Sequence, residues 1–105
     1  MQKFELELES LYLQLGELSE LIRKEEFEWK MKRNSLRRKI EYYFQKQQVV
    51  KDDIEKRNIK DIIETAEFDL TFEEKRSLRE KRKLEIEKEY LIIDISDIKF
   101  KHNIR

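Results

Sequence analysis

Residues 4–22 read FELELESLYLQLGELSELI, and this stretch decides the fold class. Its apolar residues recur with the spacing 4-3-4-3-4, which is the a/d pattern of a coiled-coil helix. Trp29 lies one heptad beyond this seam and continues it. Other leucines widen the apolar stripe, so we expect the helix to pack against more than one neighbour. The residues of the seam are Phe4, Leu8, Leu11, Leu15, Leu18 and Ile22.

The composition of the whole chain favours long helices. Of its 105 residues, 46% are charged, one is Gly and none is Pro, whereas ordinary domains have about 25% charged residues and about 5% Pro. Because sandwiches and barrels need turn residues at short intervals, an all-β fold is excluded. High charge is also typical of disordered chains, but the zero net charge and the helical periodicity favour a folded chain.

The apolar seam changes phase near Asn34 and Ser35. It resumes at Leu36, Ile40 and Tyr43, out of step with the first register. A shift of this kind is either a stutter in one long helix or a turn between two helices. Because Asn or Ser can cap a new helix, we favour a turn.

A second helix boundary is predicted near Thr71. Thr71 and Glu74 have the spacing of a capping box, which indicates a helix start at about Phe72. Residues 90–100 are rich in β-branched side chains, but a strand there would need an edge to pair with, so we expect helix. The predicted helices cover residues 3–33, 36–67 and 72–99, followed by a basic tail at 100–105.

These elements predict an all-α single domain, either an elongated helical hairpin or a three-helix, coiled-coil-like protein. We expect the seam of residues 4–22 to pair antiparallel with the stripe of residues 36–54 in the same chain. Small domains bury little apolar surface. Stripes left uncovered are therefore expected to bind a helix of another protein, or of a second copy of this chain.

Residue types that catalyse reactions are scarce in this chain. His102 is the only histidine, in a basic tail where nothing predicts a fixed position for a general base or a metal ligand. Helical carboxylate metal sites use Glu-x-x-His pairs, but Lys99 stands three residues before His102. We therefore expect no enzyme, no cofactor and no small-molecule ligand. Because no apolar run approaches the length of a membrane span, we expect a cytoplasmic protein without a membrane partner.

Charge is segregated along the chain. Residues 1–28 contain eight acids and three bases, whereas residues 30–46 contain seven bases and one acid. We expect this contrast to set the register and the choice of a partner helix. The basic, aromatic stretch 29–46 also predicts, as an alternative, binding to nucleic acid, although the neutral total charge argues against it. The candidate nucleic-acid contacts are Lys32, Arg33, Arg37, Arg38 and Lys39.

Three aromatic residues follow one another at Tyr42, Tyr43 and Phe44. Consecutive residues on a helix point over a wide arc, so Tyr43 fits the seam while the other two flank it. Aromatic side chains anchor protein interfaces, and a core layer beneath Trp29 is the alternative interpretation. The predicted partner-binding residues are Leu11, Leu15, Leu18, Trp29, Tyr42, Tyr43, Phe44, Leu84 and Leu91.

Residues 90–94 read YLIID, near the C-terminus. This Y-x-x-x-D pattern in a small helical protein resembles the export signal of WXG-type substrates of the type VII secretion system and of the small helical partners of LXG toxins. The resemblance implies that Tyr90 and Asp94 are the recognised pair and that the protein is exported by a leaderless pathway. The chain lacks the Trp-x-Gly turn of the WXG group, because Lys30 and Met31 follow Trp29, which leaves the LXG partners.

Three functional hypotheses follow. The leading one is a non-enzymatic adaptor, targeting factor or chaperone that pairs with helices of a partner protein, such as a type VII secreted toxin of the LXG type. The first alternative is a small nucleic-acid-associated regulatory protein. The second alternative is a structural coiled coil that assembles with itself.

Overall fold

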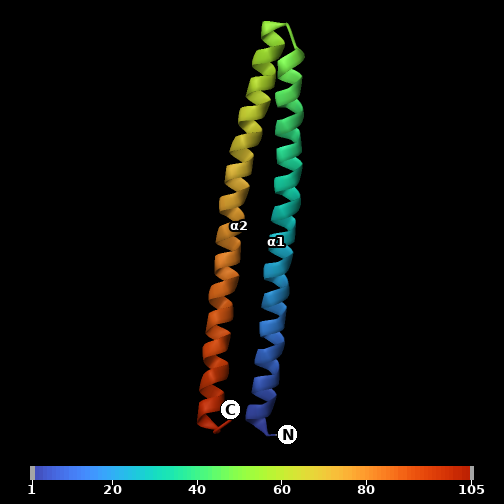
Figure 1. The fold of residues 1–105 in the computed structure, drawn as a ribbon. Helices are drawn as coiled ribbons and strands as arrows, with labels where there is room; N and C mark the ends of the chain where they lie inside the picture. The colour runs from blue at the N-terminus through green and yellow to red at the C-terminus, as the bar shows by residue number, and fades with distance from the viewer. Residues whose placement is uncertain (1, 105) are drawn as a thin grey trace. The chain divides into compact units, whose positions relative to one another are not determined.

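The computed structural model describes residues 2–104, which form two α-helices, α1 (Lys3–Val49) and α2 (Asp53–Lys101) (Figure 1). The prediction of an all-α helical hairpin is therefore confirmed, and that of three helices is wrong. The chain divides into two compact units. Unit 1 comprises Met1–Glu26 and Arg79–Arg105, and unit 2 comprises Phe27–Leu78. That the chain acts as a single domain stays a prediction.

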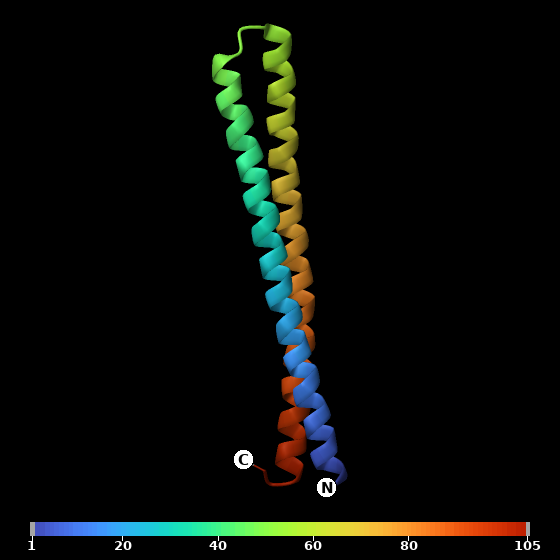
Figure 2. The ribbon, with the colours of Figure 1, turned by 90° about the vertical axis from the view of Figure 1, so that its right-hand side faces the viewer.

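Unit 2 is a helical hairpin closed by the turn at residues 50–52. The last part of α1 and the first part of α2 run antiparallel on either side of this turn (Figure 2). Asp52 caps α2: its Oδ1 accepts a hydrogen bond of 3.0 Å from the backbone N–H of Ile54, as the side chain of an N-cap residue does. Lys46 in the last turn of α1 and Asp53 in the first turn of α2 complement the helix dipoles.

The core of unit 2 is formed mainly by α2. Ile59, Ile63 and Ala66 are buried in it, and Ala66 is only 1% exposed. The stripe then continues through the half-buried Leu70 to the buried Ser77, with the spacing expected of a coiled-coil seam. Small residues at Ala66 and Ser77 leave room for larger side chains of α1 at the same level.

Unit 1 pairs the first part of α1 with the last part of α2, which lie side by side in both ribbon views (Figures 1 and 2). Leu8 and Ile95 are its buried apolar residues. The rings of Phe4 and His102 stack with their centroids 3.9 Å apart. His102 lies in the predicted basic tail, where the sequence predicts no fixed position, but its ring packs against α1.

The predicted turn at residues 34–35 is wrong, because α1 continues through it. Arg33 is half-buried at the position that links Trp29 to Leu36 with steps of four and three residues. The phase change is therefore a stutter within one helix. A charged residue can occupy a seam position because the long aliphatic part of its side chain packs there.

The helix boundary predicted at Phe72 is also wrong, because α2 runs through this region. Thr71 does not cap a helix: its hydroxyl donates to the backbone carbonyl of Glu67 one turn earlier, at 3.2 Å. This is the bond that Thr makes inside a helix. The actual turn at residues 50–52 falls inside the predicted helix 36–67.

The predicted pairing of residues 4–22 with residues 36–54 is wrong as well. Residues 36–49 belong to the same helix as residues 4–22, and a continuous helix cannot fold back on itself. In unit 1 the first seam instead faces the last part of α2, as the ion pair between Glu26 and Lys81 (3.1 Å) also indicates.

The end of α2 is closed by a hydrogen-bonded cap. The region of residues 90–100 is helical, as expected, and α2 ends at Lys101. Asn103 adopts a left-handed conformation with φ of 54°, and the N–H of Ile104 donates to the carbonyl of Lys99 at 2.8 Å. This arrangement satisfies carbonyls that a helix end would otherwise leave open.

Candidate interaction surfaces

The predicted partner-binding residues fall into two groups. Most are half-buried between the two helices of their own unit. Tyr42 and Phe44 are instead exposed, by 60% and 55%, so they offer most of their surface to another molecule. The half-buried residues are Leu11, Leu15, Leu18, Leu84 and Leu91 in unit 1, and Trp29 and Tyr43 in unit 2.

In unit 1, α1 has a second set of apolar side chains on the face opposite its seam. Leu6 and Leu13 are exposed by 54% and 66%. Each follows a seam residue, Phe4 or Leu11, by two positions, which places it about 200° around the helix axis. These residues therefore point away from α2 and form a separate face, whereas the sequence predicts that they widen the seam stripe. They are not among the predicted partner-binding residues. Their seven-residue spacing was the signal that could have identified them.

Gly16 leaves a shallow groove on the outer surface of α1 in unit 1. The groove is lined by Tyr12, Leu13, Glu17 and Leu21. Nothing lies within 4 Å of the point that a Cβ of residue 16 would occupy. The backbone is therefore open here to a close approach by another chain.

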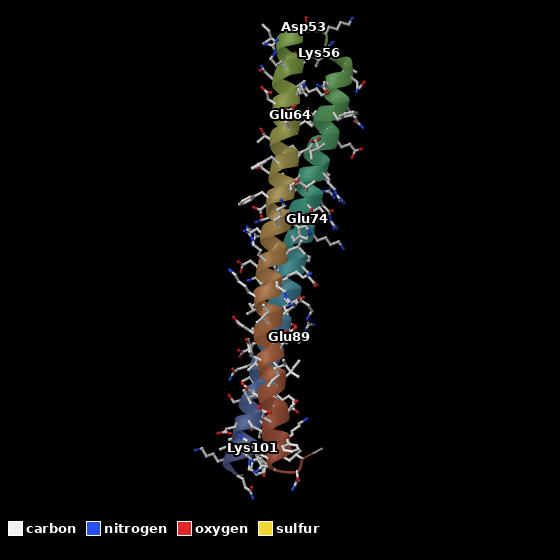
Figure 3. All side chains as sticks on the ribbon, turned by 90° about the vertical axis from the view of Figure 1, so that its left-hand side faces the viewer. Asp53, Lys56, Glu64, Glu74, Glu89 and Lys101 are labelled. Carbon is white, nitrogen blue, oxygen red and sulfur yellow. The ribbon has the colours of Figure 1, made fainter. Side chains whose placement is uncertain are left out.

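The last part of α2 also has apolar side chains with a seven-residue spacing, at Ile86, Ile93 and Phe100. All three are exposed, and Phe100 is exposed by 85%. The buried Ile95, two residues after Ile93, marks the opposite face. Charged side chains accompany this outer stripe of α2, as Figure 3 shows for Glu89.

A groove also runs between the two helices of unit 1. Its walls combine apolar side chains with two exposed glutamates, a combination that suits an amphipathic helix with basic flanks. The residues that line it are Gln14, Glu17, Leu18, Leu21, Glu87, Tyr90 and Leu91.

The predicted export pair is accessible. Tyr90 is 65% exposed and Asp94 is exposed as well. Both stand on α2, four residues apart, so they lie on one face of the helix. Recognition of this pair by an export system stays a prediction.

In unit 2 the exposed apolar residues are largely aromatic. Phe27, Met31 and Val49 stand with Tyr42 on the outer face of α1, and Val49 is exposed by 76%. The ring of Tyr42 meets that of Tyr43 edge-on, with the centroids 5.0 Å apart. On α2, Phe68 and Phe72 are exposed as well. Both side chains therefore point outward.

The candidate nucleic-acid contacts do not gather on one face. Arg37, Arg38 and Lys39 are consecutive and exposed, so at about 100° per residue they span roughly 200° of the helix surface. Lys32 is already paired, since its Nζ lies 3.2 Å from Oε2 of Glu73. Arg33 is half-buried in the seam.

Glu73 is the centre of an ion-pair cluster in unit 2. Its carboxylate accepts a hydrogen bond of 2.8 Å from Nε of Arg76 and one of 3.2 Å from Nζ of Lys32. These two bonds, that from Arg76 above all, hold the pKa of the Glu73 carboxyl below its ordinary value. The bond from Lys32 to Glu73 joins α1 to α2 by charge.

Two buried polar atoms next to this cluster lack a hydrogen-bond partner. They are the Oγ of Ser77 and the Nε of Arg33. An unpaired buried hydroxyl destabilises a fold by about 1–3 kcal/mol relative to a paired one. The seam of unit 2 is therefore imperfect at this level.

No protein-family model matches the chain, and comparisons with curated proteins and with solved structures also found no match. Between residues 2 and 104, no group of three or more His, Cys, Asp or Glu side chains is arranged to hold a metal ion. Neither described helix contains a segment that is both long and apolar enough to cross a membrane. The exposed apolar side chains are thus the chain's main candidate functional feature.

Proposed function

We propose that this protein is a helical interaction module, an adaptor, targeting factor or chaperone that pairs its outer helix faces with helices of a partner. The observation that carries the proposal is the set of exposed apolar side chains with a seven-residue spacing, such as Leu6 and Leu13 on α1 and Ile93 and Phe100 on α2. Large exposed apolar side chains in a regular stripe are typical of surfaces that another molecule covers.

The finer part of the proposal concerns the partner. The accessible pair Tyr90 and Asp94 supports a role beside an exported toxin, in which this chain covers helices of the toxin and offers the export signal. Two glutamates, Glu17 and Glu87, line the groove near Tyr90, so the partner helix would be basic and amphipathic.

The test replaces outer apolar residues without disturbing the seam. Leu6→Gln with Leu13→Gln should leave the helix content and the melting temperature nearly unchanged, because both side chains are exposed. The same variant should lose the proteins that co-purify with the tagged wild-type chain from its own cells. Ser10→Gln with Gln14→Asn, changes at neighbouring exposed polar positions, are the control. If both variants keep every associated protein, the proposal is wrong.

The nucleic-acid alternative has its own discriminating result. A protein that neutralises several phosphates loses affinity steeply as salt rises. If the chain binds DNA or RNA with an affinity that falls steeply with salt and depends on Arg37 and Arg38, the nucleic-acid regulator becomes the better-supported function.

A further inference from the structure

The two oppositely charged stretches of the sequence lie on one helix. Residues 1–28 are acidic and residues 30–46 are basic, and α1 (Lys3–Val49) contains nearly all of both. Within one chain they cannot pair with each other, because they belong to the same continuous helix. In two chains that lie antiparallel, however, the acidic stretch of one faces the basic stretch of the other.

The outer face of α1 in unit 1 offers an acidic strip for such a contact. We define the acidic strip as Leu6, Glu9, Leu13 and Glu17, all of which are exposed. Their steps of three, four and four residues keep them within an arc of about 80° at about 100° per residue. Apolar and acidic side chains thus alternate along one face of the helix.

The outer face of α1 in unit 2 offers a basic strip with the same design. We define the basic strip as Arg38, Tyr42, Lys46 and Val49; Lys46 is half-buried and the other three are exposed. Starting from Val49, the steps are three, four and four residues, and the arc is again about 80°. From Val49 back to Arg38, apolar and basic side chains alternate. From Leu6 forward to Glu17, apolar and acidic side chains alternate in the same order.

We propose that these two strips bind each other between two copies of the chain, with the α1 helices antiparallel. This inference rests on the proposed function and names a second copy as the partner of these two strips. The register aligns Leu6 with Val49 of the other copy and Leu13 with its Tyr42. It also aligns each acid of one copy with a base of the other.

The charges on the strips match this register. Glu9 meets Lys46 of the other copy, and Glu17 meets its Arg38. Among the ion pairs of residues 2–104, none involves any of these four side chains within its own chain. A parallel pairing of two copies would place like charges together, so repulsion selects the antiparallel arrangement. Gly16, beside Glu17, allows the helices to approach closely.

The first experiment is charge reversal with rescue, read as the mass of the full chain by light scattering at low salt. Wild type should have the mass of two copies. Glu9→Lys with Glu17→Lys should raise the dissociation constant about tenfold or more, and Arg38→Glu with Lys46→Glu should do the same, since each converts attraction into repulsion. All four substitutions in one chain should restore wild-type association. The control, Glu67→Lys with Glu74→Lys, changes the net charge equally at exposed positions of α2 and should have no effect.

The second experiment tests the register by disulfide formation, which is specific because the chain has no cysteine. A mixture of Glu9→Cys and Lys46→Cys chains should form a cross-linked pair on mild oxidation. Either variant alone should not, since residue 9 lies far from residue 9 of the other copy in the antiparallel register. Cross-linking of each variant with itself, and not of the mixture, would overturn the antiparallel arrangement.

Different experimental results would contradict this inference and the proposed function. If the wild-type chain has the mass of one copy at high micromolar concentration, the inference that a second copy is the partner is wrong. It is also wrong if the variant with all four substitutions associates no better than the two double variants. If Leu6→Gln with Leu13→Gln still loses a co-purifying protein of another kind, the proposed function stands without the inference. If that variant loses nothing and the chain is monomeric, both are wrong.

Discussion

Unit 1 and unit 2 use the same two helices but hold them together differently. In unit 2, α2 buries Ile59, Ile63 and Ala66, and the turn at residues 50–52 ties the two helices covalently. In unit 1 the buried apolar residues are Leu8 and Ile95, and the other leucines between the helices are only half-buried. Burial of apolar side chains is the main source of folding free energy, so we expect unit 2 to be the more stable unit.

The difference also concerns function. Regions that bind partners or rearrange are drawn from the less stable parts of a protein. Unit 1 contains the groove lined by Leu21 and Tyr90 and the accessible pair Tyr90 and Asp94. We therefore regard unit 2 as the part that maintains the helix pairing and unit 1 as the part most available to a partner protein.

The largest expected effect comes from truncating the core of unit 2. Ile63→Ala should lower the free energy of unfolding by about 2–5 kcal/mol, because it removes buried methyl groups and leaves a cavity. Ile95→Ala in unit 1 should lower it by less, since unit 1 contains fewer buried apolar residues. Denaturant unfolding followed by circular dichroism measures both. Ile93→Ala is the control, because Ile93 is 54% exposed. A larger loss for Ile95→Ala than for Ile63→Ala would contradict the ranking of the units.

Much of this architecture could be predicted from the sequence, and the breaks wrongly found in the seam have a common cause. The seam from Phe4 to Ile22 predicted helix correctly because its residues are all apolar. At Arg33 the seam residue is charged, so a count of apolar residues found a break where the helix continues. Glu73 and Ser77 hide the seam of α2 in the same way.

The true turn was missed because it contains neither Gly nor Pro. Residues 50–52 are Val-Lys-Asp, and the side chain of Asp52 alone marks the start of α2. Thr71 presented an equally good capping signal in the middle of that helix. A short capping motif marks a helix start only where the chain also turns. The position of the turn depends on which apolar stripes of the two helices pack against each other. The outer apolar residues could have been found from their seven-residue spacing, but the side that faces α2 is known only from the structure.

A second prediction sharpens the view of the unit 2 seam. Ser77 is 1% exposed and its Oγ has no hydrogen-bond partner. Ser77→Ala should raise the free energy of unfolding by about 1 kcal/mol, because it removes an unsatisfied hydroxyl at little change in volume. Thermal unfolding measures the effect. Ser96→Ala, at an exposed position of α2 in unit 1, should change stability by much less. A destabilised Ser77→Ala variant would mean that the hydroxyl is hydrogen-bonded in solution.

A third prediction uses pH to isolate the charge cluster of unit 2. Bonds from Arg76 and Lys32 lower the pKa of Glu73 in the folded chain. Its ionised form therefore contributes stability above the ordinary pKa of a glutamate, and this contribution is lost as pH falls through the lowered value. Glu73→Gln should be less stable than wild type at neutral pH, and the difference should disappear in acid. Glu74→Gln, at an exposed neighbour, is the control. A difference that persists at low pH would assign the effect of Glu73 to packing.

The smallest expected effect concerns the surface contacts that replace buried core in unit 1. Nζ of Lys99 lies 5.3 Å from the centroid of the Tyr12 ring, a distance at which an exposed cation and ring attract each other by about 0.5–1 kcal/mol. A double-mutant cycle with Tyr12→Leu and Lys99→Met should return a coupling of about 0.5 kcal/mol. The same cycle with Lys101→Met in place of Lys99→Met should return none. If both cycles give zero while Ile95→Ala still destabilises the chain, unit 1 is stabilised by buried apolar residues and not by this surface contact. The two units would then differ only in how much apolar surface they bury.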